Sequence, residues 1–252
     1  MMEYDEFLKL LRHRRTIRRF KPDSIPDEYI TKILDAGHYA MSGGNSQPWE
    51  FIVVKDPVIK EKVFQARLEG FEMTYSLEQQ RISQYRHPAY NVPPEEKEKA
   101  KAMMTSWKDA PVYILVLEDP RKQWGSVLIT RTDLGMASGS ILGTTMGHLG
   151  MTLHLAAASL GLGSMRVDIA VQDSFRQILK YPEPLRLNII MPVGYPAYDP
   201  GVPHRFGLKD MVHYDQYDMS KYLHWEDFLK YLEKIRALGR PGYRVTIGES
   251  KG

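Results

Sequence analysis

The stretch "IPDEYITKILDAGHYAMSGGNSQPWEFIVV", residues 25–54, decides the fold. Apolar residues recur at helical spacing from Ile30 to Gly37, and Pro26 fixes the chain just before two acidic residues that suit a helix start. We expect a helix over about 27–39. Residues 50–54 are rich in Ile and Val, which predicts a core strand. The stretch therefore predicts a helix, a polar loop and a strand in direct succession.

The polar loop is rich in hydrogen-bonding groups and poor in bulk. Its donors and acceptors are Ser42, Asn45, Ser46 and Gln47. Gly43 and Gly44 allow a planar ligand or another backbone to come close, and Pro48 removes one ladder hydrogen bond before the strand. This composition indicates a rim for a flat heterocycle.

Two further segments, 112–117 and 187–193, are apolar runs bounded by Pro, Asp or Gly and predict core strands. Helical patterns separate them, and residues 3–13 predict another short helix. The fold class therefore mixes α-helices and β-strands. We expect a single domain over 1–252, elaborated by a polar insertion at about 71–108 and a C-terminal arm at about 213–252.

Composition excludes several classes of protein. The chain has 252 residues, of which 43% are hydrophobic and 26% charged, and a net charge of +3, too mild for a nucleic-acid protein. It has no cysteine, which excludes disulfides and thiolate chemistry. The eight histidines form no HExxH motif, so we expect no metal. With no secretory signal and no apolar run near the roughly 20 residues that span a bilayer, we expect a cytoplasmic protein without membrane contact.

Two segments leave alternatives open. Glycines recur every fourth residue at Gly135, Gly139, Gly143 and Gly147. On a helix they would line one stripe, for close approach of another helix within the chain or across a twofold axis; alternatively part of 131–143 is a loop. In the tail, apolar residues from Trp225 to Ile235 keep helical spacing. They fit an arm packed on a partner subunit or a helix folded back on its own chain.

The densest positive charge is "RHRRTIRRFK", residues 12–21, which we call the arginine segment. A nucleic-acid patch would need more accessible aromatic side chains than Phe20 alone. For any single arginine a solvated helix end is a sufficient explanation. For the group we favour a phosphate clamp, because guanidinium forks match phosphate oxygens and Thr16 adds a hydroxyl.

Five blocks carry a family resemblance. They are "RRTIRRF" (14–20), residues 25–54 as quoted above, "AAASLGLGS" (156–164), "VGYP" (193–196) and "HRFGLKDMV" (204–212). In this order they resemble the nitroreductase family of FMN-dependent oxidoreductases. The resemblance implies an α+β homodimer, with a mixed sheet flanked by helices, intertwined subunits and two FMN sites at the interface.

The resemblance also implies roles for single residues. Arg14, Arg15 and Thr16 match positions near the FMN phosphate and ribityl chain, and Arg205 matches the basic residue that completes the phosphate site. Arg18 matches a cation near flavin N1 and O2, where it would stabilise the reduced form. The partner subunit would offer Ser42, Gly43, Asn45 and Gln47 to the flavin edge. Backbone of Ser164, Met165 and Arg166 would pass the N5 edge.

The sequence departs from the family pattern in three places. Met41 stands where many relatives have proline, and Thr145 stands where an aspartate is common. After Ser164, "MRVDIA" lacks the glycines that often pass N5. "GLGSMR" is no dinucleotide fingerprint, because its third glycine is missing. A nicotinamide donor would therefore stack on the flavin in the open site.

The resemblance implies an enzyme that takes hydride from NADH or NADPH and reduces a small electron-poor acceptor, such as a nitroaromatic or a quinone, by a ping-pong cycle. One alternative is a lidded member of the superfamily that dehalogenates a halotyrosine or fragments the flavin. Its lid would be 71–108, with substrate contacts from Glu72, Tyr75, Trp107 and Lys108. For most of these residues we favour the simpler explanation of a solvated helical excursion. A flavin-binding protein without turnover is the third possibility.

Overall fold

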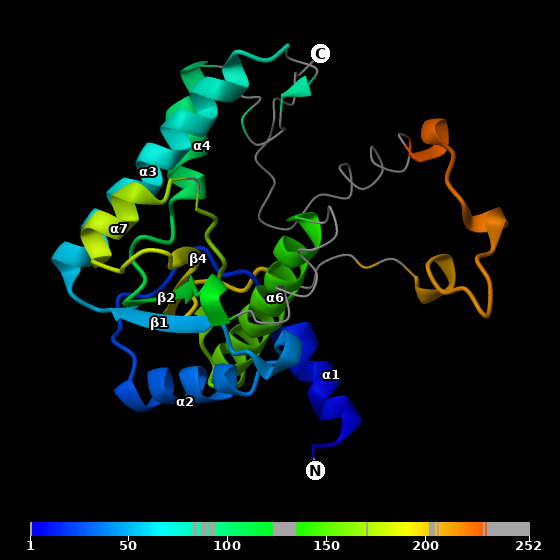
Figure 1. The fold of residues 1–252 in the computed structure, drawn as a ribbon, viewed down its shortest axis with the longest axis horizontal. Coiled ribbons are helices and arrows are strands. Elements are labelled where there is room, and N and C mark those ends of the chain that lie inside the picture. The colour runs from blue at the N-terminus through cyan, green and yellow to red at the C-terminus, as the bar shows by residue number, and fades with distance from the viewer. Residues whose placement is uncertain are drawn as a thin grey trace. The chain divides into compact units, whose positions relative to one another are not determined.

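A computed structural model of the chain describes residues 2–82, 85–86, 90, 94–122, 135–169, 171–201, 205, 207–228 and 230. Its backbone divides into two compact units, residues 1–198 and 199–252. The first unit holds the sheet and all the long helices (Figure 1). The predicted single domain over 1–252 stays a prediction.

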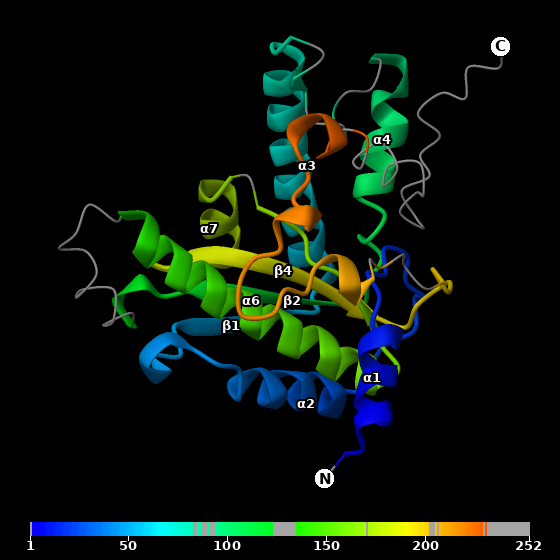
Figure 2. The same cartoon turned by 90° about the vertical axis from the view of Figure 1, so that its right-hand side faces the viewer.

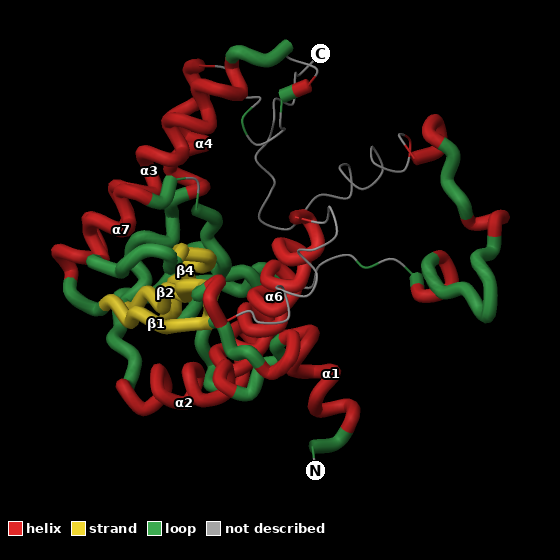
Figure 3. Tube along the Cα trace, in the orientation of Figure 1, coloured by secondary structure: helices red, strands yellow, loops and turns green. Residues whose placement is uncertain are grey.

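The first unit is built on a four-stranded sheet of order β1-β2-β4-β3 (Figure 3). Its strands are β1 (Trp49–Val54), β2 (Val112–Glu118), β3 (Gly163–Ser164) and β4 (Arg186–Gly194). All three pairings are antiparallel, with Trp49 opposite Glu118 and Val112 opposite Val193. A parallel bridge between Thr16 and Ser164 adds the arginine segment beside β3.

Both faces of the sheet are covered, which is why β2 is apolar from Val112 to Leu117 and β4 from Ile189 to Val193. Along β2, Tyr113 and Leu115 belong to one buried cluster, whereas Ile114 and Val116 belong to another on the opposite face. The first cluster includes Trp107 and side chains of α3 (Pro57–Gln79) and α7 (Asp173–Leu179). The second includes side chains of α2 (Asp27–His38) and α6 (Gly135–Ser159). Figures 1 and 2 show these two layers of helices on either side of the sheet.

Local chemistry accounts for where the helices begin. The side chain of Asp56 accepts a hydrogen bond from the backbone N–H of Ile59, 2.8 Å away, and Pro57 occupies the first helical position of α3. Asp27 and Glu28 lie in the first turn of α2, where the positive end of the helix dipole stabilises their negative charges. α1 (Tyr4–His13) has no buried residue and delivers the chain into the arginine segment.

The structure confirms the predicted helices near 3–13 and 27–39 and all three predicted strands. Residues 135–143 are helical, so this part of the glycine stripe is not a loop, whereas 131–134 lie outside the described residues. The segment 71–108 begins inside α3 rather than after it. It continues in α4 (Lys97–Met104), which two lysines join to α3. None of the described helices has the length and apolarity needed to cross a bilayer.

The second unit consists, where described, of short turns. They are the 3-10 turns Leu208–Asp210 and Met219–Lys221 and a helical turn at 225–228. Large apolar side chains stay exposed there, among them Tyr214, Tyr217 and Trp225. Most of the tail beyond 228 lies outside the described residues, so the predicted arm stays a prediction.

Candidate functional site

The arginine segment leaves α1 and runs alongside β3. The backbone N–H of Arg14 donates to Leu10 at 2.9 Å and ends the helix. The chain is then extended, and the N–H of Ile17 donates to the carbonyl of Ser164 at 3.0 Å. Thr16 pairs with Ser164 in the parallel bridge. The fold thus brings residues 14–18 next to residues 163–166, two groups that are about 150 positions apart in the sequence.

Gly163 permits this close contact. A Cβ atom on Gly163 would lie 2.7 Å from Cγ1 and 2.8 Å from Cβ of Ile17, closer than real side chains come. Ile17 is buried and β-branched, so it has little freedom to move aside. The second glycine of "GLGS" is therefore a packing requirement of the site's backbone.

Arg18 and Arg19 differ in their surroundings. The guanidinium carbon of Arg19 lies 4.9 Å from the centre of the Tyr198 ring, and its carbonyl accepts from Ala197 N–H at 3.0 Å. Arg19 is thus tied to the segment after β4. The backbone N–H of Arg18 donates to the Tyr198 hydroxyl at 3.4 Å, and its side chain is half-buried.

His154, near the end of α6, contacts the same region. Its Nδ1 lies 2.8 Å from Oγ of Ser164, and Ser164 is only 3% exposed. Burial and, to a lesser extent, the positive charges of Arg14 and Arg166 together lower the pKa of His154 from 6.5 to about 4. The ring is therefore neutral at physiological pH. Arg14 and Arg166, which the family resemblance assigns to the flavin site, thus act electrostatically on His154 beside Ser164.

The amide loop, residues 42–47, carries backbone strain. Asn45 and Gln47 have positive φ angles of 53° and 45°, and Gly44 between Gly43 and Asn45 has φ of 61°. The side chain of Ser42 holds this shape by accepting from the N–H of Gln47 at 3.1 Å. Left-handed backbone at residues other than glycine costs free energy and is concentrated at functional sites. The loop is therefore a good candidate for ligand contact.

α6 contacts the amide loop and Ser164 at separate points along its length. Thr145, which stands where the family commonly has aspartate, accepts from the N–H of Gly43 at 3.4 Å. His154 holds Ser164 nine residues further along the same helix. At about 1.5 Å per residue, these two attachment points are roughly 14 Å apart along the helix axis. Within one chain, the amide loop and Ser164 are attached at different levels of α6.

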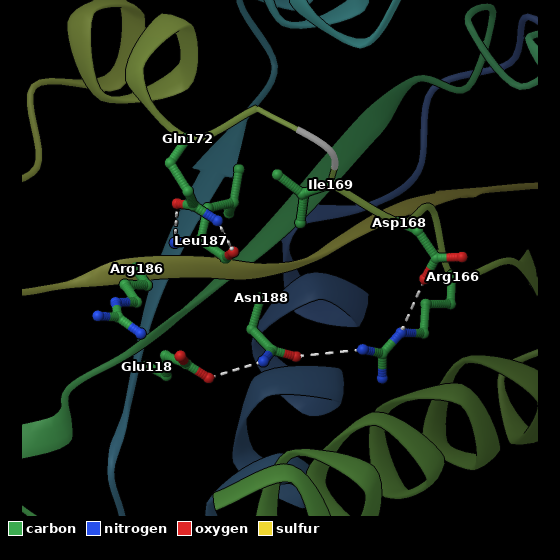
Figure 4. Close-up of a pocket in the computed structure, with 8 residues that line it drawn as sticks. All are labelled: Glu118, Arg166, Asp168, Ile169, Gln172, Arg186, Leu187 and Asn188. Atoms are coloured by element: carbon green, nitrogen blue, oxygen red, sulfur yellow. Dashed lines mark hydrogen bonds and ion pairs between the residues drawn. The ribbon is translucent and has the colours of Figure 1, made fainter. Parts of the chain in front are cut away.

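A polar pocket adjoins the segment after Ser164 (Figure 4). Its volume is about 440 Å³. The lining residues come from the ends of β2 and β4 and from the segment before α7; they are Glu118, Arg166, Asp168, Ile169, Gln172, Arg186, Leu187 and Asn188. Arg166 donates to Asn188 at 3.3 Å, and Asn188 donates to Glu118 at 2.7 Å. A lining with charges of both signs suits a small polar or ionic molecule.

The proposed substrate residues do not form one group. Glu72 accepts from Lys97 at 2.5 Å and from Lys101 at 2.9 Å, and these contacts lower the pKa of its carboxyl. Tyr75 is buried beside Glu72 between α3 and α4, and Nζ of Lys97 lies 4.9 Å from the centre of its ring.

Trp107 and Lys108 lie elsewhere. Trp107 is fully buried and packs edge-on against Phe64 and Tyr113, with ring centres 5.6 and 5.2 Å apart. A side chain with no exposed surface cannot contact a substrate in this conformation, so the structure gives Trp107 a packing role. Lys108 is exposed, with its Nζ 5.7 Å from the centre of the Phe64 ring.

Sequence reasoning missed three residues of the site. His154, Tyr198 and Asn188 belong to no motif. Met165 is buried next to Ser164, as the predicted backbone role allows. Arg205 belongs to the second unit, so its role stays a prediction. Within the described residues, no three histidine or acidic side chains gather as metal ligands would.

Comparison with known proteins identifies the family. The model described as "Nitroreductase family" matches residues 11–195. The iodotyrosine deiodinase of Haliscomenobacter hydrossis is 30% identical over 203 residues, 79% of this chain and 82% of that protein. A protein of Methanothermobacter thermautotrophicus, provisionally named NADH dehydrogenase/NAD(P)H nitroreductase, is 28% identical over 216 residues, 84% of this chain and 88% of that protein.

A solved structure agrees in fold. The NADPH:FMN oxidoreductase of Vibrio harveyi complexed with NAD+ superposes with a TM-score of 0.61 at 19% identity, covering 92% of this chain and 85% of that one. The chain therefore belongs to the nitroreductase family and has its α+β fold. The resemblance and the α+β class are confirmed, whereas the intertwined homodimer stays a prediction. The four described strands pair antiparallel rather than forming the expected mixed sheet, and parallel pairing is described at the Thr16–Ser164 bridge.

The depressed pKa of His154 predicts a pH dependence of stability. The unfolded chain takes up a proton on this residue near pH 6.5, whereas the folded chain resists protonation until about pH 4. Stability should therefore fall as the pH drops through this range, by about 3 kcal/mol at roughly 1.4 kcal/mol per pH unit. Urea unfolding at pH 7, 5.5 and 4.5 measures the effect. His154→Asn should lose less stability than the wild type, with His38→Asn as a control at an exposed histidine; equal losses in all three proteins would contradict the assignment.

Proposed function

We propose that this protein is an FMN-dependent oxidoreductase that uses NADH or NADPH to reduce a small electron-poor acceptor, such as a nitroaromatic or a quinone. The observation that carries the proposal is the convergence of Arg14, Thr16 and Arg166 around the buried Ser164. The strained amide loop, which Thr145 of α6 holds, supports the proposal. Family membership makes FMN the natural ligand for such groups.

The donor set fits FMN chemically. Guanidinium groups and a hydroxyl in the arginine segment match a phosphate and a ribityl chain, because arginine binds phosphate through paired N–H groups. His154 is neutral and adds no positive charge. The positive charge beside Ser164 therefore comes from Arg14 and Arg166. Bound FMN would supply the redox chemistry, accepting hydride from the nicotinamide and passing electrons to the acceptor.

The protein's own residues have distinct proposed tasks. Arg14, Arg15 and Thr16 would bind the phosphate end of FMN, and the backbone of residues 164–166 would pass its N5 edge. Arg18 would supply the cation near N1 and O2, where a fixed positive charge would stabilise the negative charge of the reduced ring. The pocket beside Arg166 holds a polar part of the acceptor.

We further propose that the enzyme is a homodimer whose partner contributes Ser42, Gly43, Asn45 and Gln47 to the site. Residues 135–159 contain no Asp, Glu, Lys or Arg, whereas a helix at a protein surface normally carries charge on its outer face. One face of α6 packs on the sheet, but a Cβ on Gly143 or Gly147 would meet no described atom within 4 Å, and Met151 is 40% exposed. A second copy of the chain would cover this apolar face.

Reductive dehalogenation of a halotyrosine is the second candidate. The relative from Haliscomenobacter hydrossis bears the name iodotyrosine deiodinase. The charged cluster of Glu72, Lys97 and Lys101 lies in the segment that would serve as a lid, and it offers both charge signs that a zwitterionic amino acid needs. The exposed Lys108 could add a further cation.

The role of Arg18 is testable through the flavin potential. Arg18→Gln should bind FMN but lower its midpoint potential by tens of millivolts, since about 1.4 kcal/mol of lost stabilisation equals about 30 mV for two electrons. Dye-equilibrated spectral titration measures the potential, and Arg19→Gln, whose side chain lies on Tyr198, is the matched control. Wild-type protein that takes up no FMN would end the proposed function; equal potentials in the two variants would end only the role of Arg18.

Turnover distinguishes the two candidate reactions. Oxidation of NADH or NADPH should be followed with a nitroaromatic, with a quinone and with 3-iodotyrosine. We expect turnover of the first two, unchanged in Glu72→Gln, because Glu72 is engaged by lysines of its own chain. Selective loss of iodide from 3-iodotyrosine, with a raised KM in Glu72→Gln, would favour the second candidate instead.

The interface is testable at Gly147. A Cβ atom on Gly147 would meet no described atom of its own chain within 4 Å, so the Gly147→Leu protomer should fold, but the larger side chain should keep the partner's helix away. We expect sedimentation to show a dimer for the wild type and a monomer with weak FMN binding for the variant. Ser159→Leu, at the exposed end of the same helix, is the control and should stay dimeric. A dimeric Gly147→Leu variant with normal FMN binding would refute this interface.

A further inference from the structure

His154 is one of the residues of the candidate site that no motif accounts for. It projects from the last turns of α6 toward β3, and its Nδ1 lies 2.8 Å from Oγ of Ser164. Ser164 is almost completely buried, so its hydroxyl has no solvent to bond with if the imidazole is removed. Loss of one partner in a buried hydrogen bond leaves the other partner unsatisfied, which costs more than the bond itself contributes.

Ser164 in turn holds the arginine segment. Its carbonyl accepts the N–H of Ile17 at 3.0 Å, and Thr16 is its bridge partner. Gly163, next to it, lets Ile17 pack directly on the strand. A shift of Ser164 would therefore move the backbone that carries Arg14, Arg15 and Thr16.

The imidazole also suits a place among cations. Arg14 and Arg166 both act on His154 electrostatically, and with burial they keep its ring neutral at physiological pH. A lysine or a charged histidine here would repel the guanidinium groups beside it. A neutral ring can form a hydrogen bond with Ser164 without repelling these guanidinium groups, whichever of its two nitrogens carries the proton.

We propose that His154 is a positioning residue of the flavin site: through its hydrogen bond to Ser164 it fixes the arginine segment in the geometry that binds the cofactor phosphate. This inference rests on the proposed function. It assigns to α6 a second task besides packing on the sheet, and it places the control of phosphate affinity on a residue that does not itself touch the phosphate.

The test compares two flavins that differ only in the phosphate. Dissociation constants for FMN and for riboflavin are measured by flavin fluorescence on the full-length apoprotein. Wild type is compared with Ser164→Ala, His154→Ala, the double variant and His154→Asn. Ser159→Ala is the matched control, because the Ser159 hydroxyl is exposed and, among the described residues, bonds only to Ala156 of its own helix.

We expect Ser164→Ala and His154→Ala each to weaken FMN binding about tenfold, as loss of one buried hydrogen bond implies, while riboflavin binding changes less. The double variant should be no weaker than either single variant, since both remove the same bond. His154→Asn should recover most of the affinity, because asparagine offers both a donor and an acceptor at about the reach of Nδ1. Ser159→Ala should bind like the wild type.

The outcomes separate this inference from the function on which it rests. Wild-type protein that binds FMN, with variants that bind it equally well, overturns the role of His154 and leaves the proposed function standing. Equal weakening of FMN and riboflavin, additive losses in the double variant, or no recovery in His154→Asn also overturns it, because each indicates general loss of structure. A wild type that binds neither flavin overturns both. If His154→Ala does not fold, Ser164→Ala and His154→Asn decide the matter.

Discussion

The packing of α6 against the sheet is the constraint on which the rest of the structure depends. Its inner side chains, Met146, Leu149 and Leu153, are almost completely buried in the cluster under β2 and β4. This contact fixes the helix in space, and two of its polar side chains then fix the backbone of the candidate site. Thr145 bonds to the amide loop and His154 to the strand that holds the arginine segment. Because α6 carries no Asp, Glu, Lys or Arg, it can bury one face in the core and leave the opposite face available to a partner.

The candidate site combines strain, close packing and positive charge, and each has a separate structural support. Ser42 and Thr145 hold the strained loop, Gly163 admits Ile17, and burial keeps His154 neutral near two arginines. These supports come from several elements of the fold. Such supports are what allow a protein to keep costly local geometry, because the surrounding structure over-determines it. The 71–108 segment shows the opposite arrangement: Glu72 is satisfied by lysines of α4, and Trp107 belongs to the core.

Much of the fold could be predicted because its signals are local. β2 and β4 are apolar on both faces, and the starts of α2 and α3 carry acidic residues or proline where helices favour them. β3 was missed because two residues have no periodicity, and its pairing partners are distant. The length of α3 was missed because its second half has a polar composition, although Phe71 and Tyr75 form a small buried cluster there.

The sequence by itself determined the class of fold, the family and the residue types of the candidate site, because caps, apolar periodicity and a dense run of arginines are properties of neighbouring residues. Only the tertiary structure decided which distant groups meet. It set Ser164 against Thr16, aligned His154 with Ser164, placed Trp107 in the core, and left Gly143 and Gly147 of α6 without a described neighbour. Contacts of this kind depend on the packing of helices against a sheet, and no spacing along the chain encodes them.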